Sequence, residues 1–172
     1  MAEKIHLFEG INQAVMMLTS DVLDLREDAS VCATTMHQLG RKRAIAGRIR
    51  TVRCFEDNAL VKAVMSENSE GEVLVIDGGG SLRSALMGDQ IANSGCTNGW
   101  AGAIVFGAIR DSVAIDVLDF HVKALGTNPR KSSKSGAGER DGIVEFGGVR
   151  FVPGWYLYSD SDGVVVLAGP VS

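Results

Sequence analysis

Apolar residues near the start of the chain repeat at the spacing of a helix. They stand three or four positions apart, at Ile11, Val15, Leu18, Val22 and Leu25, which predicts an amphipathic helix. Because Thr19-Ser20-Asp21 can cap a helix inside that span, one continuous helix and a broken one are equally good interpretations. Residues 41–53 then have the pattern of a strand region. Asn58 is placed to cap a further helix with Leu60, Val61, Val64 and Met65 on one face.

Two apolar runs in the middle of the chain are typical of strands buried on both faces of a sheet. The first is 72–76, and the second is 100–106, after the turn sequence Asn98-Gly99. Between them, Ser81 is placed to cap a helix through Leu86, and a second helical stretch follows Gly88. A strand, a helical segment and a strand within about 35 residues predict a right-handed parallel βαβ unit.

The last third of the chain has the pattern of short strands separated by turns. The apolar runs are 143–146, 149–152, 156–158 and 164–167. A short helix after Asp111, an extended segment at 120–125 and a polar loop at 126–138 connect them to the centre. We therefore expect residues 1–172 to form a single α/β domain, in which a C-terminal strand meander extends a sheet with helices on its outside.

Composition changes this picture mainly through glycine. The 172 residues are 45% hydrophobic and 22% charged, which is ordinary for a globular domain and excludes disordered, collagen-like and coiled-coil chains. The net charge of −4 argues against a dedicated nucleic-acid binder, which usually carries a basic surface. Glycine makes up 21 residues, about 12% against a usual value of about 7%, and predicts tight turns.

The cysteines and the N-terminus indicate a cellular compartment. Cys32, Cys54 and Cys96 are odd in number and have no C-x-x-C spacing, which favours a reduced intracellular protein over a disulfide framework or a zinc site. The first residues lack the pattern of a signal peptide. The longest nearly apolar run, 99–109, is too short to cross a bilayer. We expect a soluble, cytoplasmic protein without membrane contact.

Candidate chemistry gathers where the two central strands end, because ligands of open parallel sheets bind beyond the carboxyl ends of the strands. Arg110-Asp111 follows the second strand. The arginine offers a planar fork to a carboxylate or an oxyanion, and the aspartate offers hard oxygen to a divalent cation. A local ion pair in a loop is the simpler alternative. The segment 88–91 stands at a predicted helix start, where free amides attract anions, although an aspartate there also serves as a cap.

The remaining candidates have structural explanations. Gly78-Gly79-Gly80 lacks the lysine of a phosphate-binding loop and the G-x-G-x-x-G spacing, so a structural turn is the better interpretation. The histidines His6, His37 and His121 have no metal-ligand spacing. Basic residues recur at 41–53 and 130–134 without interleaved aromatic residues, which favours a solvated face or a subunit contact over RNA binding.

Several blocks of this sequence resemble the RraA-like family, which includes the regulator of ribonuclease E activity A and the class II 4-hydroxy-4-methyl-2-oxoglutarate aldolases. The blocks are Arg53-Cys54-Phe55-Glu56-Asp57-Asn58, residues 75–83, Gly107-Ala108-Ile109-Arg110-Asp111, Phe146-Gly147-Gly148-Val149 and Asp162-Gly163-Val164. The similarity extends from about Leu18 to Val166. It implies a β/β/α sandwich of the swivelling-domain type, assembled as a homotrimer or hexamer with active sites at subunit interfaces.

The aldolase branch of that family carries the motif D-x20-R-D, which Asp89, Arg110 and Asp111 match. The resemblance implies that Asp111 binds Mg²⁺ or Mn²⁺ and that Arg110 binds the pyruvyl group. The backbone amides of Gly88, Asp89, Gln90 and Ile91 would hold the substrate, and Asp89 would position a water for proton transfer. The expected function is a divalent-metal-dependent lyase that cleaves 4-hydroxy-4-methyl-2-oxoglutarate to two pyruvates and also decarboxylates oxaloacetate.

The resemblance leaves a second carboxylate and a second function open. Longer aldolases of the family bring a further carboxylate from a neighbouring subunit near their C-terminus, whereas this sequence stops at Ser172. Glu56 and Asp57 are the alternatives, without a motif to support them. The rival hypothesis is a non-catalytic regulator that binds and inhibits ribonuclease E or a similar RNA-degrading enzyme. The intact set of Asp89, Arg110 and Asp111 favours the enzyme.

Overall fold

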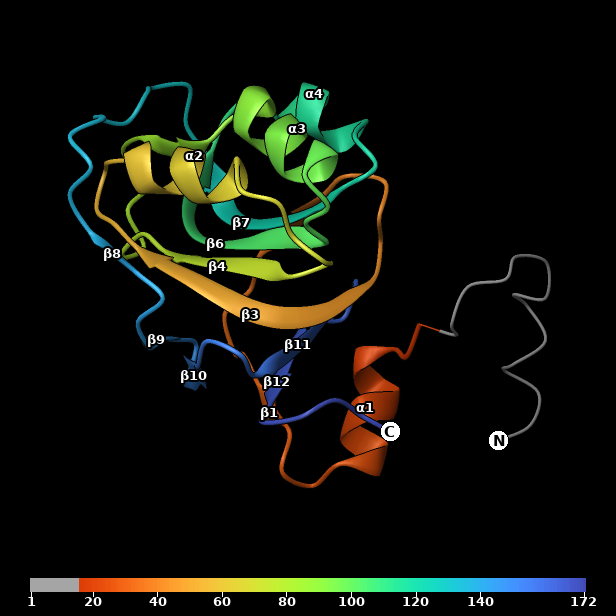
Figure 1. Ribbon diagram of the computed structural model, residues 1–172. Helices are drawn as coiled ribbons and strands as arrows, with labels where there is room; N and C mark the ends of the chain where they lie inside the picture. Colours follow the sequence, from red (N-terminus) through yellow and green to blue (C-terminus); the bar gives the residue numbers. More distant parts are fainter. Residues whose placement is uncertain (1–15) are drawn as a thin grey trace.

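The computed structural model describes residues 16–172 (Figure 1). The helices of this part of the chain are α1 (Thr19–Leu25), α2 (Ala59–Met65), α3 (Asp89–Thr97) and α4 (Ser112–Asp116). The strands are β1 (Ser30–Val31), β2 (His37–Leu39), β3 (Ile45–Arg53), β4 (Val73–Asp77), β5 (Ala85–Met87), β6 (Gly102–Ile109), β7 (His121–Thr127), β8 (Glu139–Arg140), β9 (Val144–Phe146), β10 (Val149–Phe151), β11 (Tyr156–Ser159) and β12 (Val164–Leu167). Helices α2, α3 and α4 lie on one side of a curled sheet, whereas α1 packs against β11 and β12 on the other side (Figure 1).

The long strand β3 joins the two halves of the sheet. Its residues 45–48 pair antiparallel with β11, and its residues 49–53 pair in parallel with β4. The main sheet has the order β1-β12-β11-β3-β4-β6-β7-β2, with β5 beside β6 and β8 beside β3. Strands β3, β4, β6 and β7 are mutually parallel, so their carboxyl ends meet at one edge.

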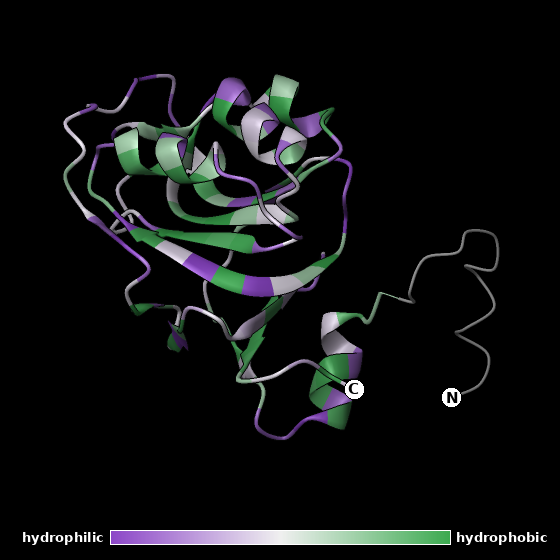
Figure 2. Ribbon diagram, in the orientation of Figure 1, coloured by the Kyte–Doolittle hydropathy of each residue, from purple (hydrophilic) through white to green (hydrophobic). Residues whose placement is uncertain are grey.

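The central strands are buried on both faces, as their continuous apolar runs predict. Along β4, Leu74 and Ile76 pack in a core with α2 and α3, whereas Val73 and Val75 pack in a second core with the hairpin β9–β10 and the strands β11 and β12. Figure 1 shows helices above the parallel strands and further strands below them, and Figure 2 shows apolar residues on both sides. The predicted α/β fold of β/β/α type, with a parallel core, is confirmed.

The helix predicted after Ser81 is wrong. Residues 85–87 form β5, which pairs in parallel with β6. Alanine, leucine and methionine favour helices by intrinsic propensity, but here all three side chains are at most 2% exposed. The segment is therefore buried on both faces, and a strand beside β6 satisfies its backbone groups where an amphipathic helix would expose one face. The crossover between β4 and β6 consequently contains one helix, α3.

Two other expectations need correction. The predicted C-terminal meander is only partly present, because β9 and β10 form a two-stranded sheet of their own and only β11 and β12 extend the main sheet. The N-cap position of α2 is Asn58 as predicted, but its side chain makes no capping hydrogen bond. Instead, the amide of Ala59 donates to Asp57 Oδ1 at 3.1 Å.

The start of the chain is described only from residue 16. Ile11, Val15 and His6 therefore lie outside the described residues. Helix α1 begins at Thr19, whose amide and hydroxyl each donate to the carboxylate of Asp160 at 2.8 Å.

Cys32, Cys54 and Cys96 are free thiols. Across residues 16–172, no helix combines the length and the apolar character needed to span a membrane.

Candidate active site

Strand β5 brings the two predicted site segments together. Met87 lies opposite Ile109 in the parallel pair β5–β6, and the amide of Arg110 donates to the carbonyl of Met87 at 2.9 Å. The chain therefore leaves β5 at Gly88 directly beside the point where it leaves β6 at Arg110. Gly88 and Arg110, which are 22 positions apart in the sequence, become neighbours.

Gly88 is the N-cap of α3, and a side chain here would displace the side chains of Asp111 and Arg110. A Cβ atom at this position would lie 2.7 Å from Asp111 Oδ2 and 3.3 Å from Arg110 Nε, closer than these side chains allow without moving. The first helical residue, Asp89, accepts a hydrogen bond from the Gln90 amide on its Oδ1 at 2.8 Å. The absence of a side chain at Gly88 thus lets Asp111 and Arg110 lie against the start of the helix.

Asp111 has a backbone conformation that is uncommon for a residue other than glycine. Its φ of 55° and ψ of 39° are left-handed, and it precedes α4 without capping that helix through its side chain. Its Oδ2 lies 3.6 Å from Arg110 Nε and 3.4 Å from the amide nitrogen of Asp89. Strained backbone of this kind often occurs at functional sites. Here it directs a partly exposed carboxylate toward Arg110 and the start of α3.

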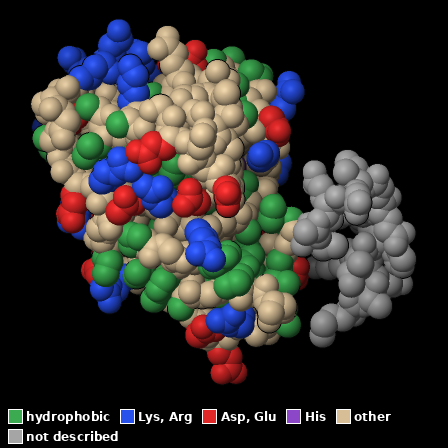
Figure 3. All heavy atoms as spheres, viewed as in Figure 1, with side chains coloured by type: hydrophobic (Ala, Val, Ile, Leu, Met, Phe, Trp, Pro, Cys, Tyr) green, Lys and Arg blue, Asp and Glu red, His purple; other side chains and the backbone are tan. Residues whose placement is uncertain are grey.

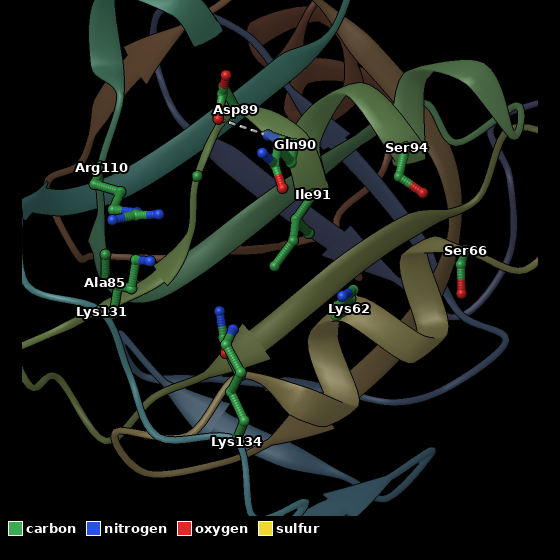
Figure 4. Close-up of a pocket in the computed structure, with 12 residues that line it drawn as sticks. Lys62, Ser66, Ala85, Asp89, Gln90, Ile91, Ser94, Arg110, Lys131 and Lys134 are labelled. Carbon is green, nitrogen blue, oxygen red and sulfur yellow. Dashed lines mark hydrogen bonds between the residues drawn. The ribbon is translucent and has the colours of Figure 1, made fainter.

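A cavity of about 150 Å³ opens beside these residues (Figure 4). Gly88, Asp89, Gln90, Ile91 and Arg110 all line it. The structure therefore brings these five positions together around one cavity. Asp111 does not line the cavity but lies against Gly88 and Arg110.

Three lysines also line this cavity, and for two of them, Lys131 and Lys134, the sequence pattern favoured a solvated face or a subunit contact instead. Lys62 comes from α2, and Lys131 and Lys134 come from the loop between β7 and β8. Figure 4 shows the tip of Lys134 approaching the cavity from the side opposite Asp89. With Arg110, the lining has four cationic side chains against one carboxylate, Asp89. Nothing in the local sequence identifies these lysines, because only the folded path of the loop brings them to the site.

The residues present fit a hard divalent cation held largely by substrate and water. Within residues 16–172, no group of three or more His, Cys, Asp or Glu side chains is arranged to hold a metal ion. Mg²⁺, however, commonly uses only one or two protein carboxylates and keeps several waters. Asp111 suits that role because its carboxylate is 39% exposed and does not cap α4.

Glu56 and Asp57 are both engaged elsewhere in the fold. Glu56 Oε1 accepts hydrogen bonds from Ser81 Oγ at 2.7 Å and from Arg83 Nε at 2.6 Å. Burial by itself raises the pKa of Asp57, but hydrogen bonds from the Ser135 and Ser133 hydroxyls and from the Ala59 and Ser135 amides outweigh it and lower this pKa. Neither carboxylate is available to the site within this chain.

The structural explanations for the glycine turn, for His121 and for the basic run at 41–53 agree with the structure. Asp77 Oδ1 accepts a hydrogen bond from the Gly79 amide at 2.9 Å in a turn. The ring of His121 is buried between hydrogen-bond partners. In the basic run, Arg50 pairs with Asp141 at 2.7 Å and Arg53 with Glu139 at 3.4 Å, as expected of a solvated face.

A family model described as RraA-like, Aldolase/RraA, matches residues 19–166. The chain belongs to the RraA-like family. Two solved structures superpose closely on it. One is described as S-adenosylmethionine:2-dimethylmenaquinone methyltransferase from Geobacillus kaustophilus HTA426, with 46% identity, a TM-score of 0.89, and coverage of 90% of this chain and 97% of that one. The other is the RNA-processing inhibitor RraA from Thermus thermophilis, with 41% identity, a TM-score of 0.88, and coverage of 91% and 95%.

A more distant RraA-like structure is that of Streptomyces coelicolor RraAS2, an unusual member of the RNase ES inhibitor RraA family. It shares 30% identity over 87% of this chain and 77% of that chain, with a TM-score of 0.68. The RraA-like family includes both aldolases and inhibitors of ribonuclease E. Membership therefore confirms the fold and the family, and the chemistry has to be argued from the site.

Proposed function

We propose that this RraA-like protein is a divalent-metal-dependent lyase that cleaves 4-hydroxy-4-methyl-2-oxoglutarate to two pyruvates and decarboxylates oxaloacetate. The observation that carries the proposal is the meeting of Arg110, Asp111 and the start of α3 beside one cavity with a cationic lining. A binding protein without chemistry has no evident need for this arrangement. The proposal concerns small keto acids, because a cavity of about 150 Å³ is smaller than usual sites for drug-sized ligands.

The site offers two ways to hold the pyruvyl end of the substrate. The planar guanidinium of Arg110 matches a carboxylate with two parallel hydrogen bonds. The helix dipole at the start of α3 and the amides from Gly88 to Ile91 favour the same negative charge. The amides of Gln90 and Asp89 already face the carboxylates of Asp89 and Asp111, so the substrate carboxylate would replace these contacts. Arg110 and the start of α3 together would hold the 2-keto acid with its C3–C4 bond beside Asp89.

The reaction needs a proton to leave the 4-hydroxyl oxygen and an enolate to form on the pyruvyl half. Asp89 would orient a water that accepts that proton while the C3–C4 bond breaks, and the bonding electron pair passes to C3. The same water would then return a proton to C3 to give pyruvate. A Mg²⁺ or Mn²⁺ ion held by Asp111 would supply positive charge that stabilises the enolate. Loss of CO₂ from oxaloacetate produces the same enolate.

The methyltransferase description of the Geobacillus relative receives no support from this site. S-adenosylmethionine carries a sulfonium cation, and the cavity lining has four cationic side chains against one carboxylate. Like charges at close range disfavour binding. A nucleoside-sized ligand would also need a larger cavity.

Inhibition of an RNA-degrading enzyme is the second candidate function. The 41% identity to the RNA-processing inhibitor from Thermus thermophilis favours it. Inhibition would use an outer surface of the protein, whereas catalysis uses the cavity. One protein can therefore perform both functions, and each needs its own assay.

Pyruvate release by the purified protein, coupled to lactate dehydrogenase, tests the lyase. The assay is run with 4-hydroxy-4-methyl-2-oxoglutarate and with oxaloacetate, in Mg²⁺ and in EDTA. We expect turnover only with metal, and a loss of about 100-fold or more in kcat/KM for Arg110→Ala and Asp111→Ala. Arg83→Ala is the matched control, because Arg83 is exposed and pairs with Glu56 outside the cavity.

Turnover no higher than that of the metal-only blank, from correctly folded protein, would contradict the proposal for these substrates. The same outcome follows if Arg110→Ala and Arg83→Ala lose activity equally. In either case, inhibition of ribonuclease E cleavage by the wild-type protein becomes the decisive assay for the second function.

A further inference from the structure

The lysines of the candidate site have no role in the chemistry proposed above. Lys62, Lys131 and Lys134 line the cavity together with Arg110. Lys134 Nζ contacts only a neutral partner in the described residues, Asn58 Oδ1 at 3.3 Å. The whole chain has a net charge of −4, so this local excess of three positive charges is a departure from the average. Figure 3 shows Lys and Arg side chains clustered over the upper end of the molecule, near α2 and the loop after β7.

The loop that carries Lys131 and Lys134 is held firmly in place. The amide of Ala85 donates to the carbonyl of Arg130 at 2.8 Å, and the amide of Asn58 donates to the carbonyl of Ser133 at 3.0 Å. The buried hydroxyl of Ser132 donates to the carbonyl of Ala85 at 2.8 Å. Hydrogen bonds from neighbouring residues therefore hold the loop backbone around the two lysines against β5 and against the start of α2.

Cations that share a small cavity repel one another unless an anion joins them. Arg110 already has a partner in the proposed function, namely the carboxylate of the pyruvyl group. A second anionic group is needed to balance the lysines. Ammonium groups on flexible stems bind a carboxylate as point charges and tolerate some variation in its position.

We propose that Lys131 and Lys134, with Lys62 beside them, bind the second carboxylate of a dicarboxylic 2-keto acid. The inference rests on the proposed function, which places the first carboxylate at Arg110. It makes the lysines specificity-determining residues: they select a keto acid with a negative charge at both ends over one with a single charge. Their chemistry does not depend on cleavage, so it can be measured by binding alone.

Equilibrium binding to 2-oxoglutarate and 2-oxopentanoate tests the inference. The two acids have the same number of carbons, but only 2-oxoglutarate has a second carboxylate, and neither has the 4-hydroxyl needed for cleavage. With Mg²⁺ present, we expect calorimetry to show that wild-type protein prefers 2-oxoglutarate by about tenfold or more. Lys131→Met and Lys134→Met should each reduce that preference by about three- to tenfold and leave 2-oxopentanoate affinity unchanged.

Lys42→Met is the control, because Lys42 does not line the cavity, and circular dichroism checks that every variant is folded. Equal affinity of wild-type protein for the two acids, or a preference that survives in the Lys131→Met/Lys134→Met double variant, overturns the inference. Either result would mean that these lysines serve another purpose, such as pairing with a carboxylate of a second copy of the chain.

A kinetic experiment tests this inference separately from the proposed function. 4-Hydroxy-4-methyl-2-oxopentanoate has a methyl group in place of the second carboxylate and would yield pyruvate and acetone. The lysine variants should raise KM for the dicarboxylic substrate and leave KM for this analogue unchanged. If the protein prefers 2-oxoglutarate in binding but cleaves neither substrate, the lysine site is supported and the lyase is rejected. If the protein cleaves the substrates but shows no preference for the dicarboxylic acid, the lyase is supported and the lysine site is rejected.

Discussion

His121, the first residue of β7, is a fully buried ionisable residue. Its Nδ1 lies 2.8 Å from the carbonyl oxygen of Lys42, and its Nε2 lies 2.9 Å from Ser159 Oγ. Burial lowers the pKa of His121 to about 4, and the charges of Lys123 and Arg43 act in the same direction, against the hydrogen bond to Lys42. The ring is therefore neutral in the folded protein at pH values where an unfolded chain already binds a proton.

The lowered pKa of His121 predicts that the folded protein loses stability as the pH falls. Above the unfolded pKa of about 6.5 both states are neutral at this residue, and as pH falls toward 4 the unfolded chain takes up the extra proton. The free energy of unfolding should therefore decrease by about 3 kcal/mol in total over that window. Urea unfolding at pH 7, 6, 5 and 4 measures the decrease.

The matched variants are His121→Gln and His37→Gln, because His37 is exposed on β2. His121→Gln should be less stable at pH 7 but should show a shallower loss of stability on acidification, whereas His37→Gln should follow the wild type. Parallel pH dependences for His121→Gln and wild-type protein would show that another group causes the acid sensitivity.

At the scale of elements, one buried aspartate organises the lysine-bearing loop. Asp57 is 2% exposed and accepts hydrogen bonds from the Ser133 hydroxyl, from the amide and hydroxyl of Ser135, and from the amides of Gly136 and Ala59. It thereby joins the start of α2 to the loop after β7. An apolar contact could not replace it, because the loop is rich in serine and glycine.

Replacing Asp57 by alanine should release this loop. We expect a decrease of about 2 to 4 kcal/mol in the free energy of unfolding, because several buried donors lose their charged acceptor. Amides at 133–136 should exchange with solvent faster, as measured by hydrogen exchange and mass spectrometry. Asp119→Ala, at an exposed carboxylate, should change neither quantity appreciably. Unaltered exchange in Asp57→Ala would indicate that the loop is held by its backbone contacts alone.

At the scale of the whole molecule, α4 presents apolar side chains to solvent beside the candidate site. The predicted short helix is present, with Ile115 buried, but Val113 is 83% exposed and the C-cap residue Val117 is 56% exposed. These two valines are one helical turn apart and therefore share a face. If active sites lie at subunit interfaces, as the resemblance implies, this face is where a second copy would cover them.

Light scattering after size exclusion tests this assembly. We expect three or six copies of the 18.2 kDa chain, which is about 55 or about 109 kDa. Val113→Asp should shift the mass toward the monomer, because a charge buried in an interface without a partner is costly. Val31→Asp, at an exposed position on the edge strand β1, should keep the wild-type mass. A monomeric wild-type protein would contradict the expectation.

The central strands and the motif of the site can be predicted from the local sequence pattern. Strands β4 and β6 are continuous apolar runs, and such runs are stable only where both faces are buried, so local pattern and tertiary environment agree. Arg110 and Asp111 are adjacent in the chain at the end of a strand, where ligand sites of parallel sheets occur. Gly88 to Ile91 were predictable as a helix start.

How those segments meet, and which residues surround them, depends on long-range contacts in the folded chain. β5 is three residues long, and its helical propensity was overridden by pairing with β6, so a local pattern could not reveal it. Lys131 and Lys134 reach the cavity because Asp57 and Ser132 hold their loop through long-range hydrogen bonds. Such contacts join residues more than forty positions apart, and neither periodicity nor spacing encodes them. Charge balance at the site is consequently a property of the folded chain.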